Sequence, residues 1–200
     1  MNDDLKIYCN CIERVRHHIT VAESVLSGKI NTGLQELNTE IIFLRLRKTL
    51  EEIAFASLSA NREKYSEARA GFATEWNARR MLGFLENINP NFYPIPLKAP
   101  QEIAPGQKHF DLVKNDYLTK DDFIFLYDRC AEVLHCRNPY SLEDPTINIK
   151  YTVEEWFNRI KTLLSWHSVQ LVDSLQRWVI QVQNEGAVQL FSAAAQETLT

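Results

Sequence analysis

Apolar residues recur along this chain at intervals of three and four rather than two, which is the spacing of one face of an α-helix. Only six glycines occur among its 200 residues. The pattern predicts five long helices, which run from about residue 4 to 26, from 34 onward, from 63 to 86, from 119 to 135 and from 152 to about 184. We therefore expect an all-α protein, an up-and-down bundle of about five long helices.

Capping residues mark two of the predicted helix starts. The hydroxyl of Thr119 can accept a hydrogen bond from the backbone amide of Asp122. Thr152 and Glu155 have the spacing of a capping box, in which each side chain binds the other residue's backbone amide. His167 falls in the middle of an apolar face of the helix that begins at Thr152, so we interpret it as a hydrogen-bonded core residue.

A proline-rich segment, residues 89–117, separates the third and fourth predicted helices and contains five prolines. It is long for a connection in a compact domain, so it predicts a loop packed over the bundle, a short strand or hairpin, or a contact surface. Residues 187–200 are expected to form a C-terminal tail. No repeat or low-complexity tract divides residues 1–200, which we interpret as a single domain.

The second predicted helix is apolar almost all round, which indicates a central position in the bundle. Its charges form two narrow stripes, one with Arg45, Lys48 and Glu52 and the other with Arg47 and Glu51. Charges on a largely buried helix must be paired or must face a cleft. The first stripe is thus part of an ion-pair network, or Arg45 or Lys48 lines an anion-binding site.

Composition and charge limit which partners, locations and cofactors we expect for this protein. Twenty-six acidic and 22 basic side chains give a net charge of −4, which excludes a global attraction to nucleic acid but not a local basic patch. No apolar run approaches the roughly 20 residues that span a bilayer. The N-terminus, Met-Asn-Asp-Asp, is unlike a secretory signal, so a cytoplasmic location is expected. The four cysteines match neither zinc fingers nor a disulfide scaffold, so we expect reduced thiols and neither metal nor cofactor.

One pair of residues has the chemistry of a catalytic site. Arg129 and His135 lie near the end of the fourth predicted helix. A guanidinium binds phosphate oxygens, and an imidazole transfers protons near neutral pH, so the pair suits metal-independent RNA cleavage. On an ideal helix the two side chains project about 120° apart. Pro139 disfavours helical geometry at the residue before it, so the chain can leave the helix near His135.

The sequence Arg129-Cys-Ala-Glu-Val-Leu-His135 late in a helix of an all-helical bundle resembles the HEPN superfamily, whose motif is an arginine, four to six residues and a histidine. Residues 40–58 and 132–140 also look like parts of HEPN-like proteins of bacterial mobile and defence loci. The resemblance implies a homodimeric, metal-independent endoribonuclease, a toxin or phage-defence effector restrained by a cognate inhibitor or defence partner. It assigns Arg129 to phosphate stabilisation and His135 to acid/base catalysis. Cys130 departs from the family, whose members often have a polar residue there.

Two other classes of function stay open. In one, the chain is a non-catalytic helical scaffold or protein-interaction module, and Arg129 and His135 make only surface or interface contacts. In the other, its aromatic side chains line a pocket for a small ligand between the helices. Loss of activity on mutation of His135 separates the ribonuclease from both.

Overall fold

The computed structural model of the chain describes residues 3–68, 77–136, 140, 147–171, 177–183 and 186–193. Within these residues the chain forms six helices and six strands, so the expectation of an all-α bundle is wrong. The helices are α1 (Asp3–Leu26), α2 (Gln35–Ala60), α3 (Arg62–Ala68), α4 (Ala78–Ile88), α5 (Lys120–Leu134) and α6 (Val153–Leu164). The strands are β1 (Ile95–Pro96), β2 (Gln101–Ala104), β3 (Gln107–His109), β4 (Trp166–Gln170), β5 (Arg177–Gln181) and β6 (Gln189–Ala193).

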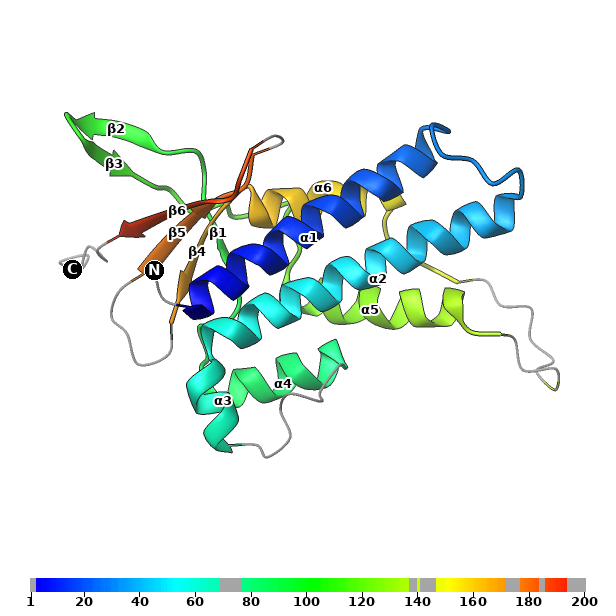
Figure 1. Ribbon diagram of the computed structural model, residues 1–200, viewed down its shortest axis with the longest axis horizontal. Helices are drawn as coiled ribbons and strands as arrows, with labels where there is room; N and C mark the ends of the chain where they lie inside the picture. Colours follow the sequence, from blue (N-terminus) through cyan, green and yellow to red (C-terminus); the bar gives the residue numbers. More distant parts are fainter. Residues whose placement is uncertain are drawn as a thin grey trace.

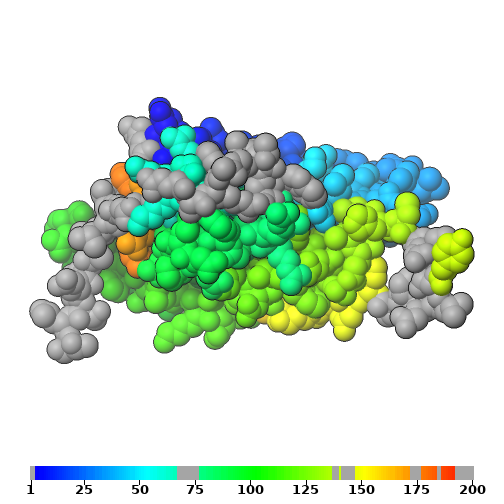
Figure 2. Space-filling model, turned by 90° about the horizontal axis from the view of Figure 1, so that it is seen from below, coloured from blue at the N-terminus to red at the C-terminus, as the bar shows by residue number. Residues whose placement is uncertain are grey.

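The helices are arranged around α2. Helices α1 and α2 form a long antiparallel hairpin, and α5 lies on the side of α2 opposite α1 (Figure 1). Helix α6 lies behind α1 in this view, and the four-stranded sheet lies at the end of the hairpin where α1 begins. Seen from below, α4 and α5 lie beside one another on the surface (Figure 2). The molecule is therefore a helical layer with a small sheet at one end.

The first, second and fourth predicted helices correspond to α1, α2 and α5. The third, predicted over residues 63–86, corresponds to α3 and α4, and residues 69–76 between them lie outside the described part of the chain. Both capping predictions are confirmed. The hydroxyl of Thr119 accepts a hydrogen bond from the amide of Asp122 at 3.1 Å, and Thr152 and Glu155 form the reciprocal bonds of a capping box.

The error lies in the predicted fifth helix, because α6 ends at Leu164 and the chain continues into strands. Strands β4, β5 and β6 pair antiparallel in sequence, and β1 completes the sheet in the order β1-β4-β5-β6. The proline-rich segment supplies β1 and the β2–β3 hairpin, and the expected tail supplies β6. Short apolar runs rich in aromatic and β-branched residues can form either a buried helix segment or a strand. Pairing with neighbouring strands decides which of the two forms.

A buried hydrogen bond joins the sheet to the helical layer. The hydroxyl of Tyr8 on α1 lies 2.9 Å from Nε2 of His167 on β4, and Nδ1 of the same ring lies 2.9 Å from the carbonyl oxygen of Leu164. A carbonyl only accepts, so Nδ1 carries the proton and Nε2 accepts from Tyr8. Both side chains are fully buried. The prediction that His167 is a hydrogen-bonded core residue is confirmed, although it lies in a strand.

This arrangement predicts that acid destabilises the protein through His167. Burial lowers the pKa of His167 from 6.5 to about 4. The unfolded chain therefore binds a proton at a higher pH than the folded chain does. Above about pH 6.5 the contribution of His167 to the free energy of unfolding is fully present. It is lost as the pH falls toward 4, and the loss is on the order of 3 kcal/mol.

Urea unfolding across this pH range measures the effect. The His167→Gln variant is the control, because glutamine can hydrogen-bond but does not titrate. Its unfolding free energy is expected to depend less on pH than that of the wild type. Equal pH dependence in the two proteins would contradict the assignment of the effect to His167.

Candidate functional site at the end of helix α5

Helix α5 holds Arg129 and His135 near its C-terminal end. Its inner face is fixed by side chains that are almost completely buried, Phe123, Leu126, Tyr127 and Cys130. His135 is the C-terminal cap of the helix, and its amide donates to the carbonyl oxygen of Ala131 at 3.0 Å. Its backbone is extended, with φ −89° and ψ 141°. The helix thus ends at the candidate histidine, as predicted, while Pro139 lies outside the described residues.

The guanidinium of Arg129 is held by neighbours on its own helix. Its Nη2 lies 2.5 Å from Oε1 of Glu132, and its central carbon lies 5.5 Å from the centre of the Phe125 ring. Its Nε is buried and has no hydrogen-bond partner among the described residues. The side chain is 31% exposed, so the outer edge of the guanidinium is accessible to an anion that displaces Glu132.

His135 is exposed, and no hydrogen bond or ion pair between it and Arg129 is found in the described part of the chain. Helical geometry gives the reason, since side chains six positions apart project about 120° from one another. The structure places the two residues at the same end of α5 but does not bring them together within one chain.

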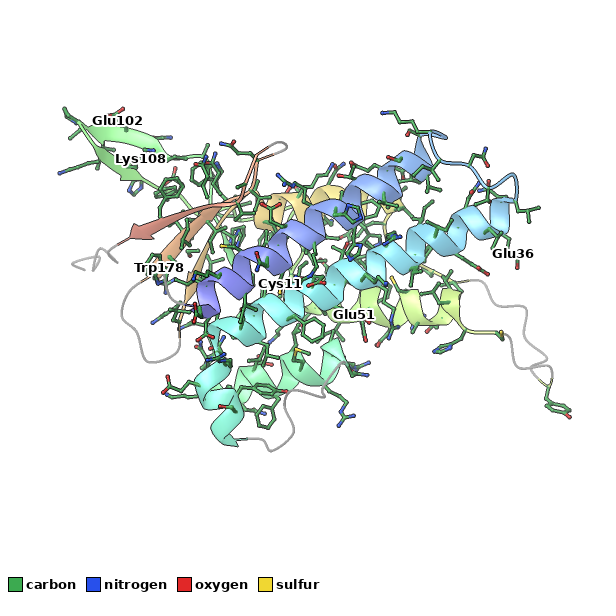
Figure 3. All side chains as sticks on the ribbon, viewed as in Figure 1. Cys11, Glu36, Glu51, Glu102, Lys108 and Trp178 are labelled. Atoms are coloured by element: carbon green, nitrogen blue, oxygen red, sulfur yellow. The ribbon has the colours of Figure 1, made fainter. Side chains whose placement is uncertain are left out.

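A polar cluster that the sequence analysis missed joins α2 to α5. Nε of Arg47 lies 3.1 Å from Oε1 of Glu51, and Nη2 of Arg47 donates to the hydroxyl of Tyr127 at 2.9 Å. The same hydroxyl lies 3.4 Å from Oε1 of Glu51, which lies on the side of α2 that faces α5 (Figure 3). Burial raises the pKa of Tyr127. The sequence pattern places Arg47 and Glu51 in one stripe of α2, but it gives no sign that Tyr127 joins them.

Arg45 faces α1 instead. Its Nη1 lies 3.3 Å from Nδ1 of His18. Glu52, the last residue of the same stripe, pairs with Arg14 of α1 at 2.6 Å. Burial lowers the pKa of His18, and the positive charge of Arg45 lowers it further. Lys48 is exposed between Arg45 and Glu52 on the same stripe. No described contact connects Arg45 or Lys48 to α5, so the structure does not bring them to Arg129 and His135. An anion site at this stripe stays a prediction.

Two hollows on the surface lie away from the C-terminal end of α5. One, of about 330 Å³, lies between α1 and α6 over an apolar floor that includes Val15, Ile19 and Ile160. The other, of about 490 Å³, is open and is lined by residues 114–117, Thr119 and Arg159. Neither is lined by Arg129 or His135. A small ligand in either of these two hollows would therefore lie away from Arg129 and His135.

Among the residues that the structure describes, no three histidine, cysteine, aspartate or glutamate side chains are grouped as metal ligands. None of the helices in this part of the chain combines the length and hydropathy required of a membrane span. Comparison with protein-family models, with curated proteins and with solved structures finds no match.

The cysteines of the chain should differ strongly in reactivity. Cys136 follows His135 directly and is exposed, whereas Cys11 and Cys130 are buried. Burial raises the pKa of the Cys11 and Cys130 thiols to about 12. Because the thiolate is the reactive form, iodoacetamide at pH 8 is expected to alkylate Cys136 first and to leave Cys11 and Cys130 unmodified.

Peptide mass spectrometry over a time course measures the order of alkylation, and the same reaction in urea is the control, in which all four thiols react. Alkylation of Cys130 in the folded protein as fast as that of Cys136 would contradict the burial of the α5 inner face.

Proposed function

We propose that the protein is a metal-independent endoribonuclease in which Arg129 and His135 carry the chemistry. The observation that carries the proposal is the position of His135, an exposed imidazole at the cap of α5, on the same helix end as a partly exposed arginine. The resemblance of this segment to the HEPN motif adds the reaction class. The proposal places the protein in the cytoplasm, as a toxin or defence effector that a cognate partner restrains.

In the proposed reaction the ribose 2′-hydroxyl oxygen attacks the adjacent phosphorus while an imidazole of His135 takes the hydroxyl proton. The bond from phosphorus to the 5′-oxygen breaks, and this oxygen takes a proton from a second imidazole. The products are a 2′,3′-cyclic phosphate and a 5′-hydroxyl. The guanidinium of Arg129 stabilises the negative charge on the phosphate oxygens.

In the proposed reaction a second copy of the chain completes the site. No contact between Arg129 and His135 is found in the described part of one chain, and the proposed reaction uses two imidazoles. A homodimer supplies His135 of each chain, one as base and one as acid. The Arg129–Glu132 pair is no obstacle, because ion pairs at a surface contribute only about 0 to 1 kcal/mol and exchange readily with a phosphate.

Cleavage of labelled RNA in EDTA tests the proposal. We expect the wild type to produce cyclic-phosphate ends. His135→Ala should reduce the rate by at least about 100-fold, because it removes the proton-transfer group. Arg129→Ala should reduce it by about 100-fold or more, because it removes charge stabilisation in the transition state.

The matched control is His109→Ala. His109 is an exposed histidine on β3, remote in sequence and element from α5, so its loss should leave the rate unchanged. Absence of cleavage, or cleavage that both α5 variants retain, would refute the proposed chemistry.

A second candidate function is a non-catalytic protein-interaction module. Two observations favour it, the engagement of Arg129 by Glu132 and the exposure of several large apolar side chains on α2. Under this alternative His135→Ala leaves every activity except partner binding unchanged, so the same variant separates the two candidates.

A further inference from the structure

The two faces of the four-stranded sheet have different surroundings. His167 on β4 and Ile180 on β5 are partners in the strand register and are fully buried, and His167 contacts Tyr8 of α1. Side chains alternate between the two faces of a sheet. The register therefore places Trp166 on β4 and Phe191 on β6 on the opposite face, which we term the outer face.

Aromatic rings gather on the outer face. The ring centres of Trp166 and Phe191 lie 5.9 Å apart, and the two planes differ by 25°. Phe110, directly after β3, has its ring centre 5.6 Å from that of Trp166. These three residues, which we term the aromatic platform, are all partly exposed, and none belongs to the main hydrophobic cluster of the described residues. The platform is therefore a feature of the surface rather than of the core.

Two cations adjoin the platform. Nζ of Lys108 lies 5.6 Å from the centre of the Phe191 ring, and Lys108 belongs to the hairpin that extends beyond the sheet (Figure 3). Arg177 on β5 is paired in register with Ala193, which makes it a diagonal neighbour of Phe191 on the outer face. Diagonal neighbours in a sheet are within reach of long side chains. No ion pair of Lys108 or Arg177 is found within the described ranges, so both charges are available to a ligand.

The acidic side chains nearby are directed elsewhere. Glu102 is the register partner of Lys108, but its carboxylate accepts a hydrogen bond from the amide of Gly106 at 3.2 Å, in the hairpin turn. Asp111 lies 3.8 Å from Nζ of Lys98. The local charge beside the platform is therefore positive, although the chain as a whole carries −4.

We propose that the outer face of the sheet binds single-stranded RNA, with a base stacked on the aromatic platform and phosphates paired with Lys108 and Arg177. Flat rings beside cations are the combination that recognises a single strand, because its bases are free to stack and its phosphates lie close to them. An antiparallel sheet with aromatic side chains on one face is a common surface for this purpose.

The other side chains of the outer face favour RNA over an apolar protein surface. Gln181 is the register partner of both Trp166 and Gln189, and Gln170 is the partner of Arg177. Glutamine amides both donate and accept hydrogen bonds, so they match the edges of bases and the ribose hydroxyls. An apolar partner would leave these amides without hydrogen bonds, which is costly.

The choice of RNA rests on the proposed function, whereas the binding of a single strand does not. In Figure 1 the sheet and the C-terminal end of α5 lie at opposite ends of the molecule. The platform thus holds RNA away from Arg129 and His135, and binding and cleavage can be measured separately. A chain that binds a single strand without cleaving RNA keeps the platform and refutes the proposed reaction. A chain that cleaves RNA without binding the strand refutes the platform.

Fluorescence anisotropy of the full chain with a labelled RNA strand of about 12 nucleotides tests the binding. Every 2′-hydroxyl of this strand is methylated, so it cannot undergo the proposed cleavage. Phe191→Leu should weaken binding about tenfold, because leucine packs on the sheet but offers no ring for stacking. Phe191→Tyr keeps a ring and should bind as the wild type does. Circular dichroism and thermal unfolding check the fold of each variant.

Titration at several salt concentrations tests the role of the cations. Lys108→Gln and Arg177→Gln should each weaken binding. Each should also reduce the slope of log affinity against log salt by about 0.7, because one phosphate contact is lost. The matched control is Lys29→Gln, an exposed lysine in the turn between α1 and α2, at the end of the molecule away from the sheet (Figure 1). Its affinity and salt slope should equal those of the wild type.

Two competitors complete the test. An RNA duplex of the same length should compete poorly, because paired bases do not expose their faces. A wild type that does not bind the strand at low salt would overturn the proposal, and so would a Phe191→Leu variant of unchanged affinity or a duplex that competes equally. Tighter binding of the DNA strand of the same sequence would overturn the choice of RNA.

Discussion

The fold depends on the enclosure of α2, since α1, α4 and α5 all pack against this one helix. Its inner residues Leu46, Leu50 and Ile53 are fully buried. A helix with neighbours on several sides has few positions where a charge can remain hydrated, and an unpaired buried charge is costly. This constraint explains why charges that face α1 or α5 have partners there, such as Glu52 with Arg14 on α1 and Arg47 with Tyr127 on α5.

The same constraint operates where the sheet meets the helices. The imidazole of His167 is fully buried and is satisfied on both nitrogens, by Tyr8 on α1 and by the carbonyl of Leu164. The bond to Tyr8 joins β4 to the start of α1, and burial lowers the pKa of the ring and keeps it neutral. A buried group that must stay neutral couples the stability of the whole fold to pH, which a surface histidine does not.

The candidate catalytic residues lie where side chains are no longer enclosed by neighbouring elements. At the C-terminal end of α5, His135 is exposed and Arg129 is partly exposed, whereas Tyr127 and Cys130 of the same helix are buried.

The sequence by itself determined the helices α1, α2 and α5, the caps at Thr119 and Thr152, the end of α5 at His135 and the burial of His167. These features depend on residues within a few positions of one another. The tertiary structure decided that residues after Leu164 form strands, that Tyr8 is the partner of His167 and that Arg45 faces away from α5. Each of these depends on a contact between segments far apart in the chain. The local periodicity of apolar residues therefore does not predict these features. Strand pairing and side-chain partners are decided only when the distant segments pack together.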